Sequence, residues 1–302
     1  MVTGQIVPMA LVGDSDAGYP ALMTIAPNLM EEQIAQANAS DHTPVVFIHG
    51  LWLLASSWDR WAGHFAQAGY APVSPGWPDD PDTVELANAN PQVFADKTIG
   101  KVSDHYASVI GRLARKPAVI GHSFGGLIAQ IIAGRGLAAA TVAVDPAPFR
   151  GILQLPVSSL RAASPALSNP ASRHRAVTLT YEQFRYSFAN AVDETQAQRL
   201  YDTYAVPAPG APLWQAATAN FNPRTDAKVD TRNPNRGPLL VVSGEKDHTV
   251  PHVLAYAAYQ RQRKNLGVTE FHEIQNRGHA LTIDDGWQQV AEAAVEFVRR
   301  FA

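Results

Sequence analysis

A five-residue glycine motif at 121–125 limits most strongly how this chain can fold. The sequence Gly-His-Ser-Phe-Gly stands between an apolar run at 117–120 and a second apolar run at 127–133. A tight strand-to-helix turn needs glycine on both sides, because the two elements approach too closely there for larger side chains. The motif therefore predicts a buried strand, a sharp turn with Ser123 at its tip, and a buried helix.

The same order of strand, loop and helix recurs along most of the chain. Helices are expected near 58–66, 102–113, 252–263 and 290–301, and the first carries apolar residues at the spacing of one core-facing stripe. Further strands are expected at 45–48, 71–74, 141–144, 239–243 and 269–274. This alternation is typical of an α/β fold with a doubly wound, mostly parallel sheet.

The alternation stops after Asp145 and resumes near residue 236. The segment 148–235 is punctuated by proline, and Thr180 with Gln183 has the spacing of a helix capping box. We therefore expect a core formed by 1–147 and 236–302, interrupted by a helical lid at 148–235. The first forty residues allow a hairpin near 5–25 and a helix near 29–37.

Composition excludes several classes of function. The net charge of −3 offers no electrostatic footprint for nucleic acid or an anionic membrane, and the absence of cysteine excludes thiol catalysis and disulfides. No apolar run approaches the ~20 residues that span a bilayer. No Lys or Arg precedes the apolar stretch at 6–12, which disfavours a signal peptide, so we expect a cytoplasmic protein. The oligomeric state is left open.

A serine hydroxyl is a weak nucleophile unless a base lies within hydrogen-bond reach. His279 follows the last expected strand, which places it at the same sheet edge as Ser123. His122 lies inside the motif, but its side chain is expected to point away from a substrate. His248 and His252 are four residues apart, yet no third metal ligand is evident, so neither a metal nor another cofactor is expected. Other histidines lack such placement: His42, His64, His105 and His174.

An acid must in turn orient that base. Asp247 follows the penultimate strand and is the expected acid, whereas Asp145, at the end of the strand after the motif, is the alternative. Glu245 stands too early in the turn. Asp284 and Asp285 fit better as acids at the start of the last helix.

An oxyanion hole is expected where the first strand ends at His49-Gly50. The backbone N–H of Leu51 can pair with that of Phe124 to stabilise a developing negative charge. Trp52 is the alternative donor. Because the backbone donates, the identity of the side chain matters little here.

Together these motifs resemble the α/β-hydrolase fold family, particularly its lidded esterase and non-haem haloperoxidase-like members. The resemblance rests on motif order, serine then aspartate then histidine, and on the matched pieces His49-Gly50, 121–126, Gly244 with Asp247, and Gly278-His279. It implies a serine hydrolase that cleaves a carboxylic ester through an acyl-enzyme. Relatives also cleave lactones, thioesters, amides or carbon–carbon bonds, whereas dehalogenase and epoxide hydrolase relatives carry aspartate in place of Ser123. The alternative is a ligand-binding or receptor-like member with little turnover.

The lid predicts an apolar substrate pocket. Arginines of the lid, such as Arg150, Arg161 and Arg185, are scattered and do not indicate an anionic substrate. We therefore expect a small apolar ester as the partner. The expected pocket residues are Trp52, Phe149, Leu153, Phe184, Phe188 and Trp214.

Overall fold

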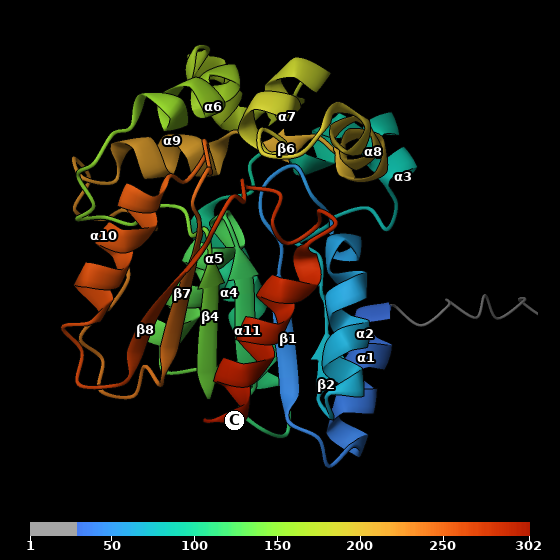
Figure 1. Ribbon diagram of the computed structural model, residues 1–302, viewed down its shortest axis with the longest axis vertical. Helices are drawn as coiled ribbons and strands as arrows, with labels where there is room; N and C mark the ends of the chain where they lie inside the picture. Colours follow the sequence, from blue (N-terminus) through green and yellow to red (C-terminus); the bar gives the residue numbers. More distant parts are fainter. Residues whose placement is uncertain (1–28) are drawn as a thin grey trace, which may run out of the picture.

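The computed structural model describes residues 29–302, which form a parallel sheet with helices on both faces (Figure 1). The strand order is β2-β1-β3-β4-β7-β8, and every neighbouring pair is parallel. The predicted doubly wound α/β fold is confirmed. The strands of this sheet are β1 (Pro44–Ile48), β2 (Ala71–Val73), β3 (Ala118–His122), β4 (Ala140–Val144), β7 (Leu239–Gly244) and β8 (Thr269–Ile274).

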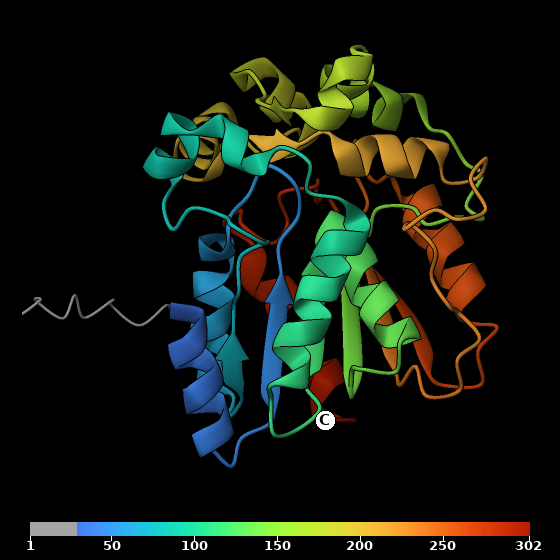
Figure 2. The ribbon, with the colours of Figure 1, turned by 180° about the vertical axis from the view of Figure 1, so that it is seen from behind.

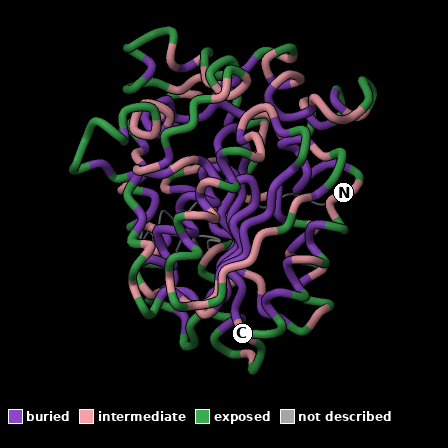
Figure 3. The backbone as a smooth tube through the Cα atoms, turned by 60° about the vertical axis from the view of Figure 1, so that its left-hand side comes forward, coloured by how far each residue is buried: buried purple, intermediate pink, exposed green. Residues whose placement is uncertain are grey.

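Side chains alternate along each central strand and fill two separate apolar layers. In β1, Val46 and Ile48 face one layer, whereas Val45 and Phe47 face the other. The tube view shows the sheet buried at the centre of the molecule (Figure 3). The first layer is closed by α1 (Leu29–Ala39), α4 (Ile99–Gly111), α5 (Phe124–Gly134) and α10 (His252–Gln262), and the second by α2 (Asp59–Gln67) and α11 (Trp287–Arg299) (Figures 1 and 2).

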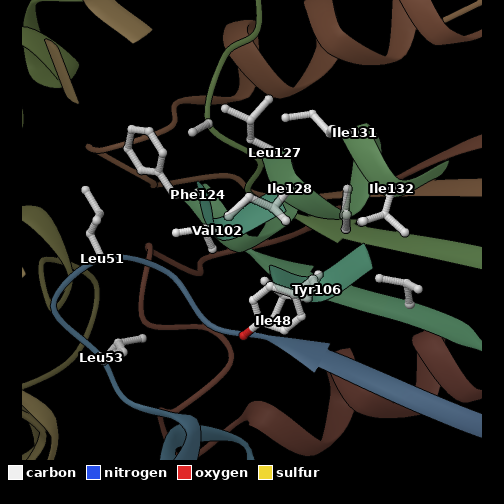
Figure 4. Close-up of a cluster of buried hydrophobic side chains, with 14 of the residues drawn as sticks. Ile48, Leu51, Leu53, Val102, Tyr106, Phe124, Leu127, Ile128, Ile131 and Ile132 are labelled. Carbon is white, nitrogen blue, oxygen red and sulfur yellow. The ribbon is translucent and has the colours of Figure 1, made fainter. Parts of the chain in front are cut away.

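Helix α5 is buried along its whole length. Its apolar side chains pack against Val102 and Tyr106 of α4 and against Ile48 at the end of β1 (Figure 4). A helix that is apolar on all sides must also pack against another element on its outer face, and α4 packs there. Helix α4 starts three residues before the expected position, because the Thr98 hydroxyl accepts a hydrogen bond from the backbone N–H of Lys101.

A layer of short elements lies over the carboxyl ends of the strands (Figures 1 and 2). We call this layer the cover. Most of it comes from the chain between β4 and β7, within the predicted lid. These elements are α6 (Val157–Leu167), η3 (Pro170–His174), β5 (Ala176–Val177), α7 (Tyr181–Ser187), α8 (Glu194–Tyr204), β6 (Ala208–Pro209) and α9 (Ala211–Thr218).

The cover also includes a segment from the first half of the chain. Helix α3 (Val84–Ala89) and the 3-10 helix η2 (Pro91–Phe94) join it, and a third 3-10 turn, η1 (Ala55–Trp58), leads from the loop after β1 into α2. Leu54, Ala87, Phe94 and Val206 form a small apolar cluster between these segments and the lid. The proposed domain limits at 147/148 and 235/236 stay a prediction, and the cover is broader than that insertion.

The expected hairpin at 5–25 lies outside the described residues, whereas the expected helix at 29–37 corresponds to α1. The predicted capping box is confirmed, since Thr180 and Gln183 exchange both hydrogen bonds at the start of α7. Among residues 29–302, no helix combines the length and hydropathy needed to span a bilayer.

The first turn of α5 sits directly against the end of β1. A Cβ built on Gly125 would lie 2.0 Å from the carbonyl oxygen of Ile48, so no other residue fits without moving the backbone. This contact holds the Ser123 turn at a fixed distance from the neighbouring strand.

Gly125→Ala should therefore destabilise the protein severely, because the clash is with backbone atoms. Gly63→Ala is the matched control: a Cβ at this position in α2 meets nothing within 4 Å, and alanine should raise the free energy of unfolding by about 0.5–1 kcal/mol. Denaturant unfolding of both variants checks the pair. Equal stability changes would show that the close contact is absent.

Candidate active site

Ser123 occupies a strained turn between β3 and α5. Its φ of 56° and ψ of −120° are unfavourable for a residue with a side chain, and its N–H donates to the Val144 carbonyl at 2.9 Å. The residue is 4% exposed and lines a cavity beneath the cover. This geometry holds the hydroxyl at the tip of the turn, as the motif predicts.

His279 and Asp247 are brought together by the loops after β8 and β7. His279 Nδ1 lies 2.6 Å from Asp247 Oδ2, and neither side chain is exposed. The other carboxyl oxygen of Asp247 accepts the backbone N–H of Thr249 at 2.6 Å and of Val250 at 2.9 Å. These two amides hold the carboxylate in one orientation.

The second ring nitrogen of His279 is available for chemistry. Within residues 29–302, Nε2 of His279 is buried and has no hydrogen-bond partner. The ring packs against Phe188, with centroids 4.9 Å apart, and against His122, the residue before Ser123, at 4.6 Å. An unpartnered nitrogen beside the serine turn can accept a proton from the hydroxyl.

Asp145, the alternative acid, lies beside Asp247 but has different hydrogen-bond partners. Its Oδ1 accepts the Gly244 N–H at 2.8 Å. Its Oδ2 forms no hydrogen bond with residues 29–302. Complete burial and the nearby charge of Asp247 raise the pKa of Asp145 well above its usual value. His279 Nδ1 contacts the carboxylate of Asp247, so Asp247 is the acid that the geometry favours.

His122 lies with Asp145 and His279 in a group of buried polar side chains. Its Nε2 donates to the His279 carbonyl at 2.9 Å, which leaves Nδ1 as a bare acceptor, and burial lowers its pKa well below the usual value. His122, Asp145 and His279 place ligand atoms within 4.8 Å of one another. A divalent cation prefers ionised carboxylates, whereas burial and the nearby charge of Asp247 raise the pKa of Asp145 and so favour its neutral form. The group therefore fits a metal ion poorly.

The predicted oxyanion loop lies directly against the serine. A Cβ built on Gly50 would be 2.8 Å from Ser123 Cβ, so the backbone there passes close to the hydroxyl. Phe124 is the first residue of α5, and its N–H has no acceptor within the helix. Together with the Leu51 N–H, it can face the space beside Ser123 Oγ.

Trp52 connects the oxyanion loop to the cover. Its φ is 62°, its indole N–H donates to the Val177 carbonyl at 3.0 Å, and its own carbonyl accepts the Val206 N–H at 3.3 Å. Its ring also meets Phe188 edge to face at 6.2 Å. The left-handed backbone is thus held from both sides by the lid.

A buried ionic chain supports the same loop and was not predicted. His49 Nδ1 donates to the Gly50 carbonyl at 2.9 Å, and His49 Nε2 lies 3.1 Å from Asp80, which pairs with Lys97 at 2.5 Å. The Trp77 indole stacks on His49 and donates to its carbonyl. Sequence showed only a polar, proline-rich loop around Asp80, because the partners are 17 to 31 residues apart.

The cavity above Ser123 has a volume of about 140 Å³ and is mainly apolar. Two of the six predicted pocket residues, Trp52 and Phe149, line it. Sequence reasoning missed several small or aliphatic residues in the loop after β4, on α6 and α9, and around the start of α10, because helical spacing alone does not reveal which face meets a cavity. These include Ala147, Leu160, Ala162, Ala216, Val250 and Leu254.

The other four predicted pocket residues lie elsewhere, which corrects the sequence-based pocket. Leu153 is 70% exposed, and Trp214 binds Ser172 through its indole instead of lining the cavity. Phe188 covers His279 and stacks on Phe184. Phe184 lines a separate cavity of about 290 Å³ on the far side of Trp52, together with Asn88, Thr178, Leu179, Tyr201, Asp202, Ala205 and Val206.

The other histidines and acids that the sequence offered as candidates form local contacts. His248 lies 3.1 Å from the Tyr186 carbonyl, and His252 pairs with Glu273, so the two histidines do not share a site. Asp284 forms a buried ion pair with Arg277. These contacts explain their placement without a catalytic role.

The neutral state of Asp145 predicts how stability depends on pH. A raised pKa means that the folded protein binds a proton which the unfolded chain releases, so stability falls as pH rises above about 3.8 towards the folded value. In Asp145→Asn this loss is absent. Denaturant unfolding from pH 5 to 8 should show wild type losing stability relative to the variant. A constant difference across that range would mean that Asp145 is ionised in the fold.

Comparison with family models identifies the family, and the solved structures agree on the fold. Residues 45–293 match the model of the alpha/beta hydrolase family, whereas no curated protein matches the sequence significantly. A similar solved structure is an extracellular alpha/beta-hydrolase from a Paenibacillus species, with 22% identity, a TM-score of 0.59, and coverage of 84% of this chain and 98% of that one.

Two others are a monoacylglycerol lipase from Paleococcus ferrophilus and an esterase from Thermogutta terrifontis, both 17% identical. Their TM-scores are 0.61 and 0.60, and they cover 86% and 85% of this chain and 97% and 90% of their own. Such identities speak for the fold alone. With the family model spanning most of its length, the chain belongs to the alpha/beta hydrolase family.

Proposed function

We propose that this hydrolase cleaves an apolar carboxylic ester through an acyl-enzyme on Ser123. The observation that carries the proposal is the buried pair of His279 and Asp247, 2.6 Å apart, beside a serine in a strained turn. Esterase and lipase structures among the neighbours are consistent with this reaction.

In the first half of the reaction, Ser123 Oγ attacks the ester carbonyl while His279 Nε2 takes its proton. Asp247 holds Nδ1–H of the same ring and stabilises the imidazolium that forms. The N–H groups of Leu51 and Phe124 stabilise the oxyanion. His279 then gives its proton to the alcohol as the carbon–oxygen bond breaks, and the acyl group stays on Ser123.

In the second half, water attacks the acyl-enzyme and His279 again acts as the base. Because the His279 side chain has no exposed surface and Phe188 covers its ring, this water enters through the Ser123 cavity after the alcohol leaves. The same route serves substrate and water, which limits hydrolysis to acyl groups that leave room beside the serine.

Ser123→Ala should lower kcat by about 10⁶-fold if the triad acts as a unit. The variant should keep the stability of wild type, because the change removes one atom. Hydrolysis of a p-nitrophenyl ester and labelling by a fluorophosphonate probe provide the measurement. Near-normal turnover by this variant would end the serine-hydrolase proposal.

Asp247→Asn should lower kcat by about 10³–10⁴-fold, because the imidazole loses its oriented acceptor. Asp145→Asn replaces one neutral group by another of the same shape and should cost far less. Kinetics of both variants on the same ester decide the matter, and the opposite ranking would make Asp145 the catalytic acid.

The apolar cavity predicts a dependence on acyl chain length. Each buried methylene contributes up to about 0.8 kcal/mol, which is roughly a fourfold rise in kcat/KM, until the cavity is filled. We expect kcat/KM to rise from acetyl to medium-chain or compact aryl esters and then to fall. An ester series with one leaving group checks this. A flat response, or a preference for charged acyl groups, would contradict the assigned pocket.

A further inference from the structure

The cover exposes large apolar side chains at one edge. Phe221 is 89% exposed, Val157 82% and Leu155 74%, and Leu153 and Leu160 are also exposed. We call these five residues the apolar rim. Scattered single apolar residues are common on protein surfaces, whereas a contiguous group marks a surface that meets something apolar.

Hydrogen bonds hold together the two segments that carry the rim, although they are distant in sequence. The side-chain amide of Asn220 accepts the Gly151 N–H and donates to the Ile152 carbonyl, both at 2.7 Å. The next residue, Phe221, is therefore fixed beside the chain that carries Leu153. A second link, from Arg150 N–H to the Ala227 carbonyl at 2.8 Å, holds the same two segments together.

The rim also borders the entrance of the Ser123 cavity. Leu155, Leu160 and Asn220 are exposed, yet they line the same cavity as Ser123. Whatever covers the rim therefore sits where a substrate enters. A rigid protein partner or a second copy of the chain would close this entrance, whereas a fluid apolar phase would leave it open to small esters.

Arginines lie near the rim, and acids are sparse in the two segments that carry it. Between 146 and 181 and between 203 and 225 there is no Asp or Glu, although the chain as a whole has a net charge of −3. Asp226 stands two residues after Arg224 and accepts a hydrogen bond from Gln215. Within residues 29–302, Arg150 and Arg224 form no ion pair, and Arg261 donates only to the Gly151 carbonyl, at 2.5 Å. Net charge alone, on which the expectation of no footprint for an anionic membrane rests, does not describe this local distribution of charge.

We propose that the apolar rim docks onto an anionic lipid surface, from which apolar esters enter the Ser123 cavity. The five apolar side chains would sit among the acyl chains, and the three arginines would face the anionic headgroups. The proposal names the source of substrate for the esterase proposed above and rests on it.

The test uses the full chain and vesicles of two compositions, phosphatidylcholine alone and phosphatidylcholine with phosphatidylglycerol. Wild type should bind the mixed vesicles more tightly. The triple variant Leu153→Ser/Val157→Ser/Phe221→Ser should bind them at least about 100-fold more weakly. Arg150→Gln and Arg224→Gln should each weaken binding about fivefold and reduce the difference between compositions.

Leu266→Ser is the matched control. Leu266 is fully exposed beside Arg263 and Lys264, but it lies between α10 and β8, away from the cover (Figure 1). This variant should bind vesicles as wild type does. An equal loss in Leu266→Ser and the triple variant would overturn the proposal, because binding would then not depend on the rim.

Hydrolysis of a short, water-soluble ester is measured for every variant. The triple variant should retain it, since none of its residues lines the Ser123 cavity. Absence of vesicle binding with normal ester hydrolysis would overturn docking and leave the esterase standing. Absence of hydrolysis in wild type would instead reject the esterase. A wild-type dimer that the triple substitution dissociates would identify a second copy as the occupant and overturn the lipid proposal.

Discussion

The close contact between Gly125 and the Ile48 carbonyl is the constraint on which the site depends. It brings the first turn of α5 against the end of β1, so the Ser123 turn and the Gly50 loop are positioned by the same packing. A positive φ at serine costs of the order of 1–3 kcal/mol. Burial of α5 on all sides offsets that cost, because the helix cannot shift without exposing apolar side chains.

The core could be predicted from sequence because its physical signals are local. Each central strand is a short apolar run with side chains that alternate between two layers, and β1 with Val45 to Ile48 is an example. The confirmed family and fold follow from the order of these runs. Element ends were less predictable, since the start of α4 depends on a cap by Thr98. The participation of α3 and η2 in the cover depends on tertiary contacts that no periodicity reveals.

In the candidate site, too, some features could be predicted from local sequence and others depend on tertiary contacts. Parallel strands end at one edge of a sheet, so residues that follow β3, β7 and β8 had to meet there, and Ser123, Asp247 and His279 do lie at that edge. Strand order alone predicts Asp247 over Asp145 as the acid, and the contact between His279 and Asp247 supports that prediction. The chain from His49 through Asp80 to Lys97 joins residues whose relation is purely spatial. Only two of the six predicted pocket residues line the cavity, because an apolar helix has faces towards both core and cavity.

Trp52 has a consequence for how such enzymes diverge. Its backbone belongs to the oxyanion loop, while its indole and carbonyl are held by Val177 and Val206 of the cover. An exchange of the lid for that of a relative would therefore also remove the supports of the loop. The lid therefore takes part in shaping the backbone beside Ser123 as well as in roofing the cavity.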